Sequence, residues 1–192
     1  MREINRVKEA ELYRTAASLF NKNGYTGTSM RQICKSIGIR ESSLYHYIRG
    51  KEDLLYHICE WSMYHSLTAI EPIAQLPLRP DLKLKKMIEK HIIILIQNAN
   101  EHATMLKEMR SLSVPKRRKI IRLRDQYKSI FREVIEAGFQ QKLFNAVDIK
   151  VMTFALLGMM NSIIRWYSVD GETKIEDIAA IFSDLFLKGA RR

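Results

Sequence analysis

Residues 28–55 read TSMRQICKSIGIRESSLYHYIRGKEDLL, and this stretch decides the fold. The apolar side chains of its first part follow the i, i+3, i+4, i+7 spacing of an amphipathic helix, namely Met30, Ile33, Cys34 and Ile37. Gly38 ends that helix, and a shorter helix with a polar outer face is expected over residues 41–48. Two helices joined by so short a turn are typical of a helix-turn-helix, whose second helix enters the major groove of DNA.

The chain on either side of this motif also predicts helices. A helix over residues 5–22 stops at Asn23-Gly24, a longer one begins at Lys51, and three of the four prolines interrupt the pattern between residues 72 and 80. Further helices are expected over residues 82–99, 101–111, 115–141, 148–167 and 174–188. Only 8 Gly and 4 Pro among 192 residues leave little material for the turns of a sandwich or barrel, so the predicted fold class is all-α.

The helix-turn-helix segment resembles the DNA-binding signature of the TetR family of bacterial regulators. The resemblance covers roughly the first third of the chain and depends chiefly on Gly38, Leu44-Tyr45, Tyr47 and Lys51-Glu52. The sequence departs from the family pattern at Cys34, Ile37, Arg40, Ser42 and Ile48. The resemblance implies a transcriptional repressor, not an enzyme, that binds a palindromic operator in double-stranded DNA as a homodimer and is released by a small-molecule effector.

Two domains are expected on this basis. Residues 1–50 form a three-helix helix-turn-helix domain that binds DNA, and residues 51–192 form a larger helical domain that binds the ligand and dimerises. The helix that begins at residue 51 connects them, and it is the expected lever between effector and DNA.

Nine side chains are candidates for contact with DNA. Hydroxyl and backbone N–H groups at a helix start suit phosphate oxygens, which favours Thr28 and Ser29. The start and outer face of the third helix reach base edges through Arg40, Ser42, Ser43 and His46, with Arg40 the first candidate for specificity. Donors to the DNA backbone are expected from Tyr45, Tyr47 and Lys51, and the resemblance implies the same for the last two. The alternative for either tyrosine is packing at the edge of the core.

The charge of the chain favours a polyanionic partner. The formal net charge is +11, and residues 110–128 hold eight Lys or Arg against one Asp. Nucleic acid, an anionic membrane and a phosphorylated small molecule all attract such a segment, and a solvated helix face also accounts for it. A basic amphipathic protein of the membrane surface is therefore an alternative from a different functional class.

The later part of the chain is similar to TetR-type regulators that sense acyl-CoA thioesters. The similarity is carried by residues 156–167, followed by Asp170-Gly171 and residues 186–189. It implies an apolar tunnel for the acyl chain and cations for the CoA phosphates, from Arg110 and the run 116–119. The remaining ligand-binding candidates are Phe154, Arg165, Trp166 and Tyr167. A sensor of hydrophobic drugs that controls efflux is the alternative within the family.

The last two long helices carry the candidates for the dimer interface. Small residues, Gly158 and Ser162, share one stripe of the helix over 148–167. The final helix has a wide apolar face that includes Ile178, Phe182, Leu185 and Phe186. The resemblance implies a four-helix seam with a second copy, and an ordinary intrachain core is the alternative.

Other classes of protein are disfavoured by what the sequence lacks. It has no G-x-S-x-G, H-E-x-x-H or glycine-rich phosphate loop, and neither a cofactor nor catalysis is expected. Cys34 and Cys59 lack the spacing of zinc ligands, so no metal site is expected. The N-terminus shows no secretory signal and the most apolar run, residues 151–164, is too short to span a bilayer, so a cytoplasmic protein without membrane contact is expected.

Overall fold

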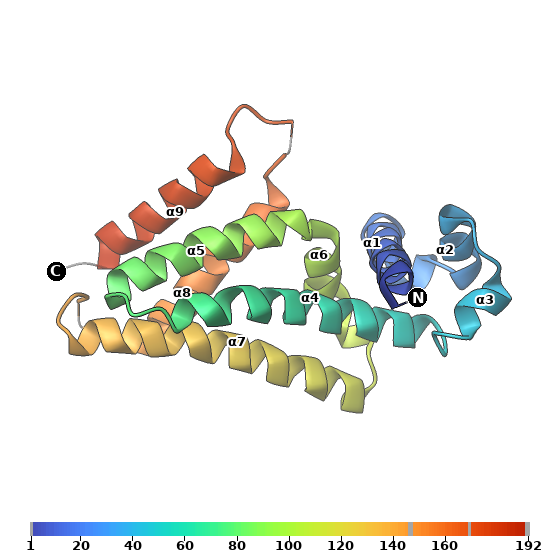
Figure 1. Cartoon of the computed structure of the whole chain (residues 1–192), viewed down its shortest axis with the longest axis horizontal. Coiled ribbons are helices and arrows are strands. Elements are labelled where there is room, and N and C mark those ends of the chain that lie inside the picture. The colour runs from blue at the N-terminus through green and yellow to red at the C-terminus, as the bar shows by residue number, and fades with distance from the viewer. Residues whose placement is uncertain (1, 146–147, 169, 191–192) are drawn as a thin grey trace. The chain divides into compact units, whose positions relative to one another are not determined.

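The computed structural model describes residues 2–145, 148–168 and 170–190, with side chains from Glu9 onward (Figure 1). Within these residues the chain forms nine α-helices and two short 3-10 helices, and no strand, which confirms the all-α prediction. The elements are α1 (Arg2–Gly27), α2 (Met30–Ile37), α3 (Glu41–Tyr45), α4 (Lys51–Ala74), α5 (Pro80–Gln97), α6 (Ala99–Glu108), η1 (Met109–Ser111), α7 (Val114–Gln140), α8 (Ile149–Asn161), η2 (Ser162–Arg165) and α9 (Ile175–Ala190).

The helices gather into two compact units. The first comprises Met1–Met63 and Asn98–Arg122, and the second comprises Tyr64–Gln97 and Leu123–Arg192. Helices α4 and α7 each contribute one part to the first unit and the other part to the second. The functional division at residue 50 remains a prediction.

The first unit surrounds the helix-turn-helix. Its interior consists of apolar side chains from α1 to α4, among them Phe20, Ile33, Leu44, Leu54 and Leu55, each almost fully buried. Helix α1 kinks at Gly24, where φ is 75°, close to the stop predicted from Asn23-Gly24. Helix α6 packs against α1 and adds two polar contacts, from the Thr104 hydroxyl to the Ala17 carbonyl at 3.1 Å and from the Asn21 amide to the Asn100 carbonyl at 2.8 Å.

Helix α2 has the predicted bounds, and both of its ends are capped. Ser29 Oγ accepts from the Gln32 backbone N–H at 3.2 Å, and Gln32 Oε1 accepts from the Ser29 N–H at 2.7 Å, which forms a capping box. At the other end Gly38 adopts φ 70° and ψ 27°, a left-handed conformation that lets its N–H reach the carbonyls of Cys34 and Lys35. Local sequence therefore determines both ends of α2.

Helix α3 is shorter than the predicted 41–48. It ends at Tyr45, after which the Tyr47 and Ile48 N–H groups both donate to the Leu44 carbonyl, at 2.9 and 3.0 Å. The shared acceptor makes a tight turn, and this turn buries Ile48 beside Leu44 in the core. Burial of Ile48 therefore takes precedence over continuation of the helix.

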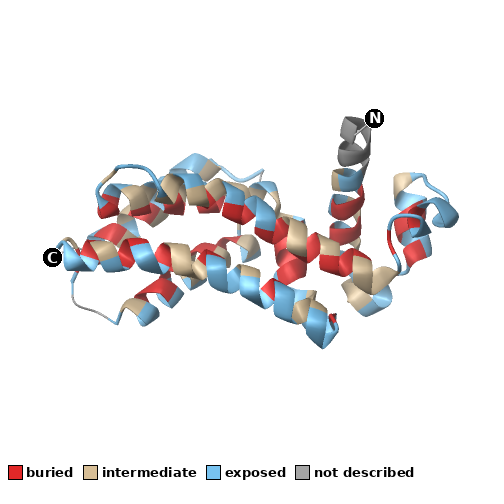
Figure 2. Ribbon diagram, turned by 60° about the horizontal axis from the view of Figure 1, so that its bottom comes forward, coloured by how far each residue is buried: buried red, intermediate tan, exposed pale blue. Residues whose placement is uncertain are grey.

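The second unit is built around α5, which packs against α8 and α9. Figure 2 shows buried residues alternating with exposed ones along these helices, as expected for amphipathic segments. On α5 the buried set includes Leu84, Met87, Ile88, Ile92 and Leu95. Helix α4 includes Pro72, one of the three prolines that interrupt the pattern, and ends two residues later at Ala74.

The ring of Phe144 packs closely against the backbone of Gly138. Gly138 lies near the end of α7, and a side chain there would overlap the ring of Phe144, which is almost fully buried.

We expect Gly138→Ala to destabilise the protein by about 1–3 kcal/mol through overpacking, measured by urea unfolding. Gly189→Ala is the matched control, because Gly189 lies in helix α9 with open space around it and alanine favours a helix there. Equal stability of the two variants would contradict the assigned packing.

Candidate nucleic-acid interface and effector region

Helix α3 and the turn after it present polar and aromatic side chains outward. We call this set the reader surface: Arg40, Ser42, Ser43, Tyr45, His46 and Tyr47, all exposed. Tyr45 is 50% exposed and Tyr47 72%, whereas Leu44 and Ile48 beside them are buried. The two tyrosines therefore do not pack as core residues in the protomer, and their hydroxyls are available as donors.

Arg40 is the N-cap residue of α3, but its side chain does not cap the helix. Its carbonyl accepts from the Ser43 and Leu44 N–H groups at 3.0 and 3.2 Å, but its guanidinium makes no capping hydrogen bond. A serine or threonine at this position would use its hydroxyl to cap the helix. The arginine instead leaves five N–H donors at the exposed start of the helix, in the fork geometry that suits guanine.

Thr28 and Ser29 differ in accessibility. Thr28 is only 1% exposed, and its hydroxyl donates inward to the carbonyls of Gly24 at 2.9 Å and Leu19 at 3.2 Å. Ser29 is exposed at the start of α2, where it caps the helix. Of the two predicted phosphate contacts, only Ser29 is exposed, and its hydroxyl bonds to Gln32.

The side chain of Lys51 lies against the turn between α1 and α2. Its ammonium donates to the carbonyls of Tyr25 and Thr28, both at 2.9 Å, and lies 4.5 Å from the centroid of the Tyr25 ring. It is half-buried rather than extended toward solvent.

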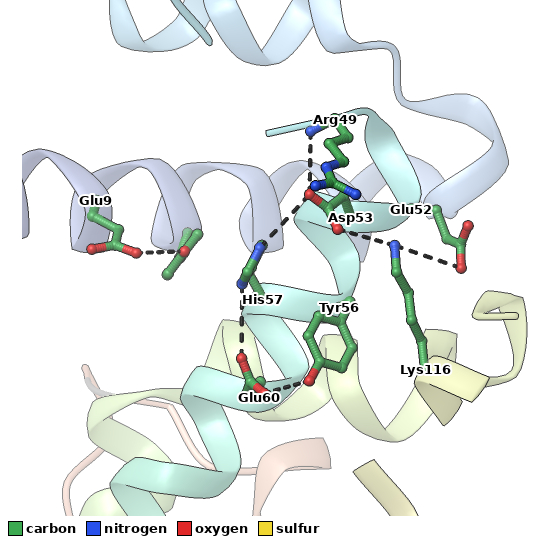
Figure 3. A network of polar contacts seen from close by, with 9 residues as sticks. Glu9, Arg49, Glu52, Asp53, Tyr56, His57, Glu60 and Lys116 are labelled. Carbon is green, nitrogen blue, oxygen red and sulfur yellow. Dashed lines mark hydrogen bonds and ion pairs between the residues drawn. The ribbon is translucent and has the colours of Figure 1, made fainter. Parts of the chain in front are cut away.

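The next two residues of α4, Glu52 and Asp53, hold the start of α7. Lys116 Nζ lies 3.0 Å from Asp53 Oδ1 and 3.9 Å from Glu52 Oε1 (Figure 3). The Ser113 N–H donates to Glu52 Oε1 at 2.9 Å. Asp53 also accepts from the Arg49 N–H at 3.2 Å. We call these contacts the α4–α7 junction.

The junction shifts the titration of both carboxylates. The Ser113 backbone N–H, helped by Lys116, lowers the pKa of Glu52. For Asp53 burial favours the neutral acid, but the Arg49 N–H and Lys116 outweigh it and the pKa is lowered as well. Because a lowered pKa means that the folded state stabilises the anion, this stabilisation is present above the ordinary carboxyl pKa of about 4 and is lost as the pH falls.

His57 and neighbouring side chains extend the junction toward α1. His57 Nε2 lies 3.7 Å from Asp53 Oδ2 (Figure 3). The His57 ring stacks on that of Tyr13 in α1, with ring centroids 6.3 Å apart. Glu60 lies 3.8 Å from His57 Nδ1 and accepts from the Tyr56 hydroxyl. The candidate DNA-binding residues predicted from the sequence include none of Tyr13, Tyr56, His57 and Glu60. The stacking of His57 on Tyr13 joins α4 to α1 across residues distant in sequence, so no short pattern marks it.

The cations of the basic segment, residues 110–128, lie in different surroundings. Lys116 belongs to the junction, and Lys116 and Lys119 lie 5.9 and 5.8 Å from the centroid of the Tyr56 ring. Arg110 is exposed, with its Nε donating to the Lys107 carbonyl at 3.3 Å. In the second unit Lys128 pairs with Asp125 at 2.7 Å and lies 5.4 Å from the Phe154 ring.

The remaining effector candidates all belong to the second unit. Phe154 and Trp166 are about half exposed, Arg165 is exposed and Tyr167 is half-buried. Trp166 stacks on Phe182 with ring centroids 6.2 Å apart. The groove of about 230 Å³ between the ends of α4, α5 and α7 is lined by residues that include Glu71, Lys83 and Glu133, and by none of the predicted ligand residues.

The predicted interface residues lie on α8, η2 and α9. Gly158 and Leu185 are exposed, Ser162, Phe182 and Phe186 are half-buried, and Ile178 is buried within the protomer. The sequence prediction omitted Val151 and Ile181, which are both 56% exposed. Ile181 precedes Leu185 by four residues, and residues four apart share one face of a helix. This spacing could have identified Ile181 from the sequence.

Comparison with known families agrees with this architecture. The profile described as "Bacterial regulatory proteins, tetR family" matches residues 12–58, and the one described as "Tetracyclin repressor-like, C-terminal domain" matches residues 77–190. The chain belongs to the TetR family. It is a DNA-binding transcriptional repressor of that type and not an enzyme, as the helix-turn-helix predicted.

Three relatives illustrate the similarity. The TetR family regulator PfmR from Thermus thermophilus is 32% identical, with a TM-score of 0.86, over 94% of this chain and 99% of that one. AibR in complex with isovaleryl coenzyme A and operator DNA is 28% identical, with a TM-score of 0.83, over 92% and 96%. The fatty acid metabolism regulator protein of Bacillus subtilis (strain 168) is 21% identical over 96% of each chain.

Two absences bear on the alternative functions. Among the described residues, no three His, Cys, Asp or Glu side chains are grouped so that they could ligate a metal ion. No helix in the described part of the chain combines the length and the apolar character that crossing a membrane requires.

The reader surface predicts different effects for two of its residues. We expect Arg40→Ala to relax the choice of base at one operator position, with a loss of about 1–3 kcal/mol for the preferred base and little loss elsewhere. Tyr47→Phe removes a hydroxyl donor and is expected to weaken binding to all sequences equally. Binding of each variant to a set of singly substituted operators measures both effects, and a uniform loss from Arg40→Ala would assign that residue to the phosphates instead.

The α4–α7 junction predicts a pH-dependent effect on stability. We expect Lys116→Met to lower the free energy of unfolding by roughly 1 kcal/mol near neutral pH. The difference from wild type should shrink below about pH 4, where Glu52 and Asp53 become protonated. Thermal unfolding as a function of pH measures this difference, with Arg118→Met, an exposed change two residues away, as the control. A difference that does not depend on pH would contradict the ion pairs.

Proposed function

We propose that the protein is a homodimeric repressor that leaves a palindromic operator when it binds an acyl-CoA thioester. The observation that carries this proposal is the reader surface. Each protomer has one such surface and can therefore contact one half of a palindrome. A palindrome needs two such surfaces about 34 Å apart, or a multiple of that distance. As a bacterial DNA-binding regulator it is proposed to act in the cytoplasm.

The apolar face of the last helices supports the homodimer. Val151, Ile181 and Leu185 are each more than half exposed on α8 and α9. Large exposed apolar side chains on a protein of this charge favour contact with another apolar surface. A second copy of the same face provides one, because a two-fold interface pairs each patch with itself.

Two features support an acyl-CoA as the effector. AibR, which aligns over most of this chain, was crystallised with isovaleryl coenzyme A and operator DNA, and the Bacillus subtilis relative is named for fatty acid metabolism. The second unit offers Arg165 and Trp166, consecutive residues that are both exposed. A guanidinium binds phosphate and an indole stacks on adenine, which are the two polar parts of coenzyme A.

Release follows from linkage between two sites. Operator DNA selects one spacing of the two reader surfaces, and an effector that binds better at another spacing must weaken DNA binding by the same factor. Helix α4 starts at the junction in the first unit and continues into the second, so it is the proposed lever.

Titration of CoA esters tests the effector assignment. The protein is bound to labelled DNA from its own upstream region, and anisotropy is followed as free CoA, isovaleryl-CoA, octanoyl-CoA or palmitoyl-CoA is added at fixed salt. We expect one chain-length class to release the DNA and free CoA to leave it bound. Arg165→Met should raise the required concentration about tenfold or more, as expected for loss of a charge-assisted hydrogen bond, whereas Lys174→Met should not.

Two outcomes would contradict this proposal in different ways. Retention of DNA with every ester, but release by a hydrophobic drug, would leave the repressor and replace its effector. Tight binding to anionic vesicles without any binding to DNA would favour the membrane-surface alternative.

A further inference from the structure

The end of α6, η1 and the start of α7 carry a high density of positive charge. Residues 107–122 contain seven Lys or Arg and one acid, Glu108, which accepts from the Tyr25 N–H of α1 at 3.4 Å. Five of the cations are exposed, and we call them the α7 basic surface: Lys107, Arg110, Arg118, Lys119 and Arg122. In the described part of the chain, none of these five forms an ion pair with a carboxylate. Charge of this density without compensating acids attracts a polyanion.

Arg118 and Arg122 lie on the outward face of α7. Residues four apart share one side of a helix, and residue 118 lies about 200° around the helix from Ile120, which is fully buried. The same outward side exposes two apolar side chains, those of Val114 and Ile121. The two arginines therefore extend toward solvent, where a partner can reach them.

The α4–α7 junction holds the start of α7 beside the first turn of α4. The Ser113 N–H donates to Glu52 at 2.9 Å, and Lys116 Nζ lies 3.0 Å from Asp53 Oδ1. Lys51, which precedes these two acids in the same turn of α4, is a predicted contact to the DNA backbone. The start of α7 is thus continuous with the edge of the predicted DNA interface.

We propose that the α7 basic surface neutralises phosphates of the duplex that flanks the operator, in addition to the contacts of the reader surface. This surface belongs to the same compact unit as the helix-turn-helix, whereas the effector candidates between residues 154 and 167 belong to the other unit. Phosphate contacts do not depend on base sequence, so they add affinity without adding discrimination. The proposal rests on operator binding, which the family assigns, and not on the identity of the effector.

The dependence of binding on duplex length and on salt tests this role. One duplex holds the palindrome from the upstream DNA alone, and a second extends it by about ten base pairs, one helical turn, on each side. We expect wild type to bind the longer duplex more tightly and with a steeper slope of log K against log salt concentration, because each neutralised phosphate contributes about 0.9. Arg118→Met combined with Arg122→Met should bind the short duplex as wild type does. It should bind the longer duplex about tenfold or more weakly than wild type at low salt, with a reduced slope.

Lys86→Met combined with Lys90→Met is the matched control. It removes two exposed cations that are also four residues apart, on α5 in the second unit. We expect this variant to match wild type on both duplexes. Equal losses in the two double variants would attribute the effect to net charge and overturn the proposal. Unchanged length and salt dependence in the Arg118 and Arg122 variant would also overturn it, and would leave these arginines as a solvated helix face.

Two further measurements on the same variants distinguish other polyanions. If DNA binding is unchanged but more acyl-CoA is needed for release, the surface binds CoA phosphates. If DNA binding is unchanged but binding to phosphatidylglycerol vesicles is lost, the surface binds membranes, to which Val114 and Ile121 would contribute. Either result would overturn the proposal and leave the repressor intact, whereas failure of wild type to bind any duplex would overturn the proposed function as well.

Discussion

The first turn of α4 is the constraint on which the DNA-binding geometry depends. Three consecutive residues there contact two other segments of the first unit, since successive side chains on a helix are about 100° apart. Lys51 holds the carbonyls of the turn between α1 and α2, while Glu52 and Asp53 hold Ser113 and Lys116 at the start of α7. One helical turn thus joins the DNA reader to the helix that leads into the second unit. A change in the direction of α4 cannot occur without straining one of these sets of contacts.

Such a constraint is needed because α3 is too short to define its own position. Five residues form barely one turn, and an isolated helix of that length is not stable in water. Its place is set by burial of Leu44 and Ile48 and by the elements on either side. The exposed arginine, serines and tyrosines gain a fixed orientation only through this support, which is the requirement for recognition of base edges. We therefore propose that the stability of this part of the protein also supports discrimination between DNA sequences.

Local sequence patterns predicted the bounds of α2 and the exposure of the α3 side chains, but they did not predict contacts between residues distant in sequence. The apolar spacing of residues 30–37, the Ser29 cap and Gly38 each act within a few residues, so both ends of α2 and the outward face of α3 followed from sequence. The Lys116 contact with Asp53 joins residues 63 positions apart, and the sequence placed Lys116 in a uniform basic run. Burial of the Thr28 hydroxyl likewise depends on the kink at Gly24, which periodicity does not describe. Local hydrogen bonds are encoded in short patterns, whereas pairing between helices depends on how they pack.

Hydrogen–deuterium exchange tests the role of the first turn of α4 most directly. Exchange of the amides of residues 24–50 is compared between wild type and Asp53→Asn, both free of DNA and under conditions where both are folded. If this turn holds the reader, these amides exchange faster in the variant, while those of α5 and α9 keep their wild-type rates. Unchanged exchange over residues 24–50, together with weaker operator binding, would mean that Asp53 acts on DNA without supporting the reader, and would contradict the account.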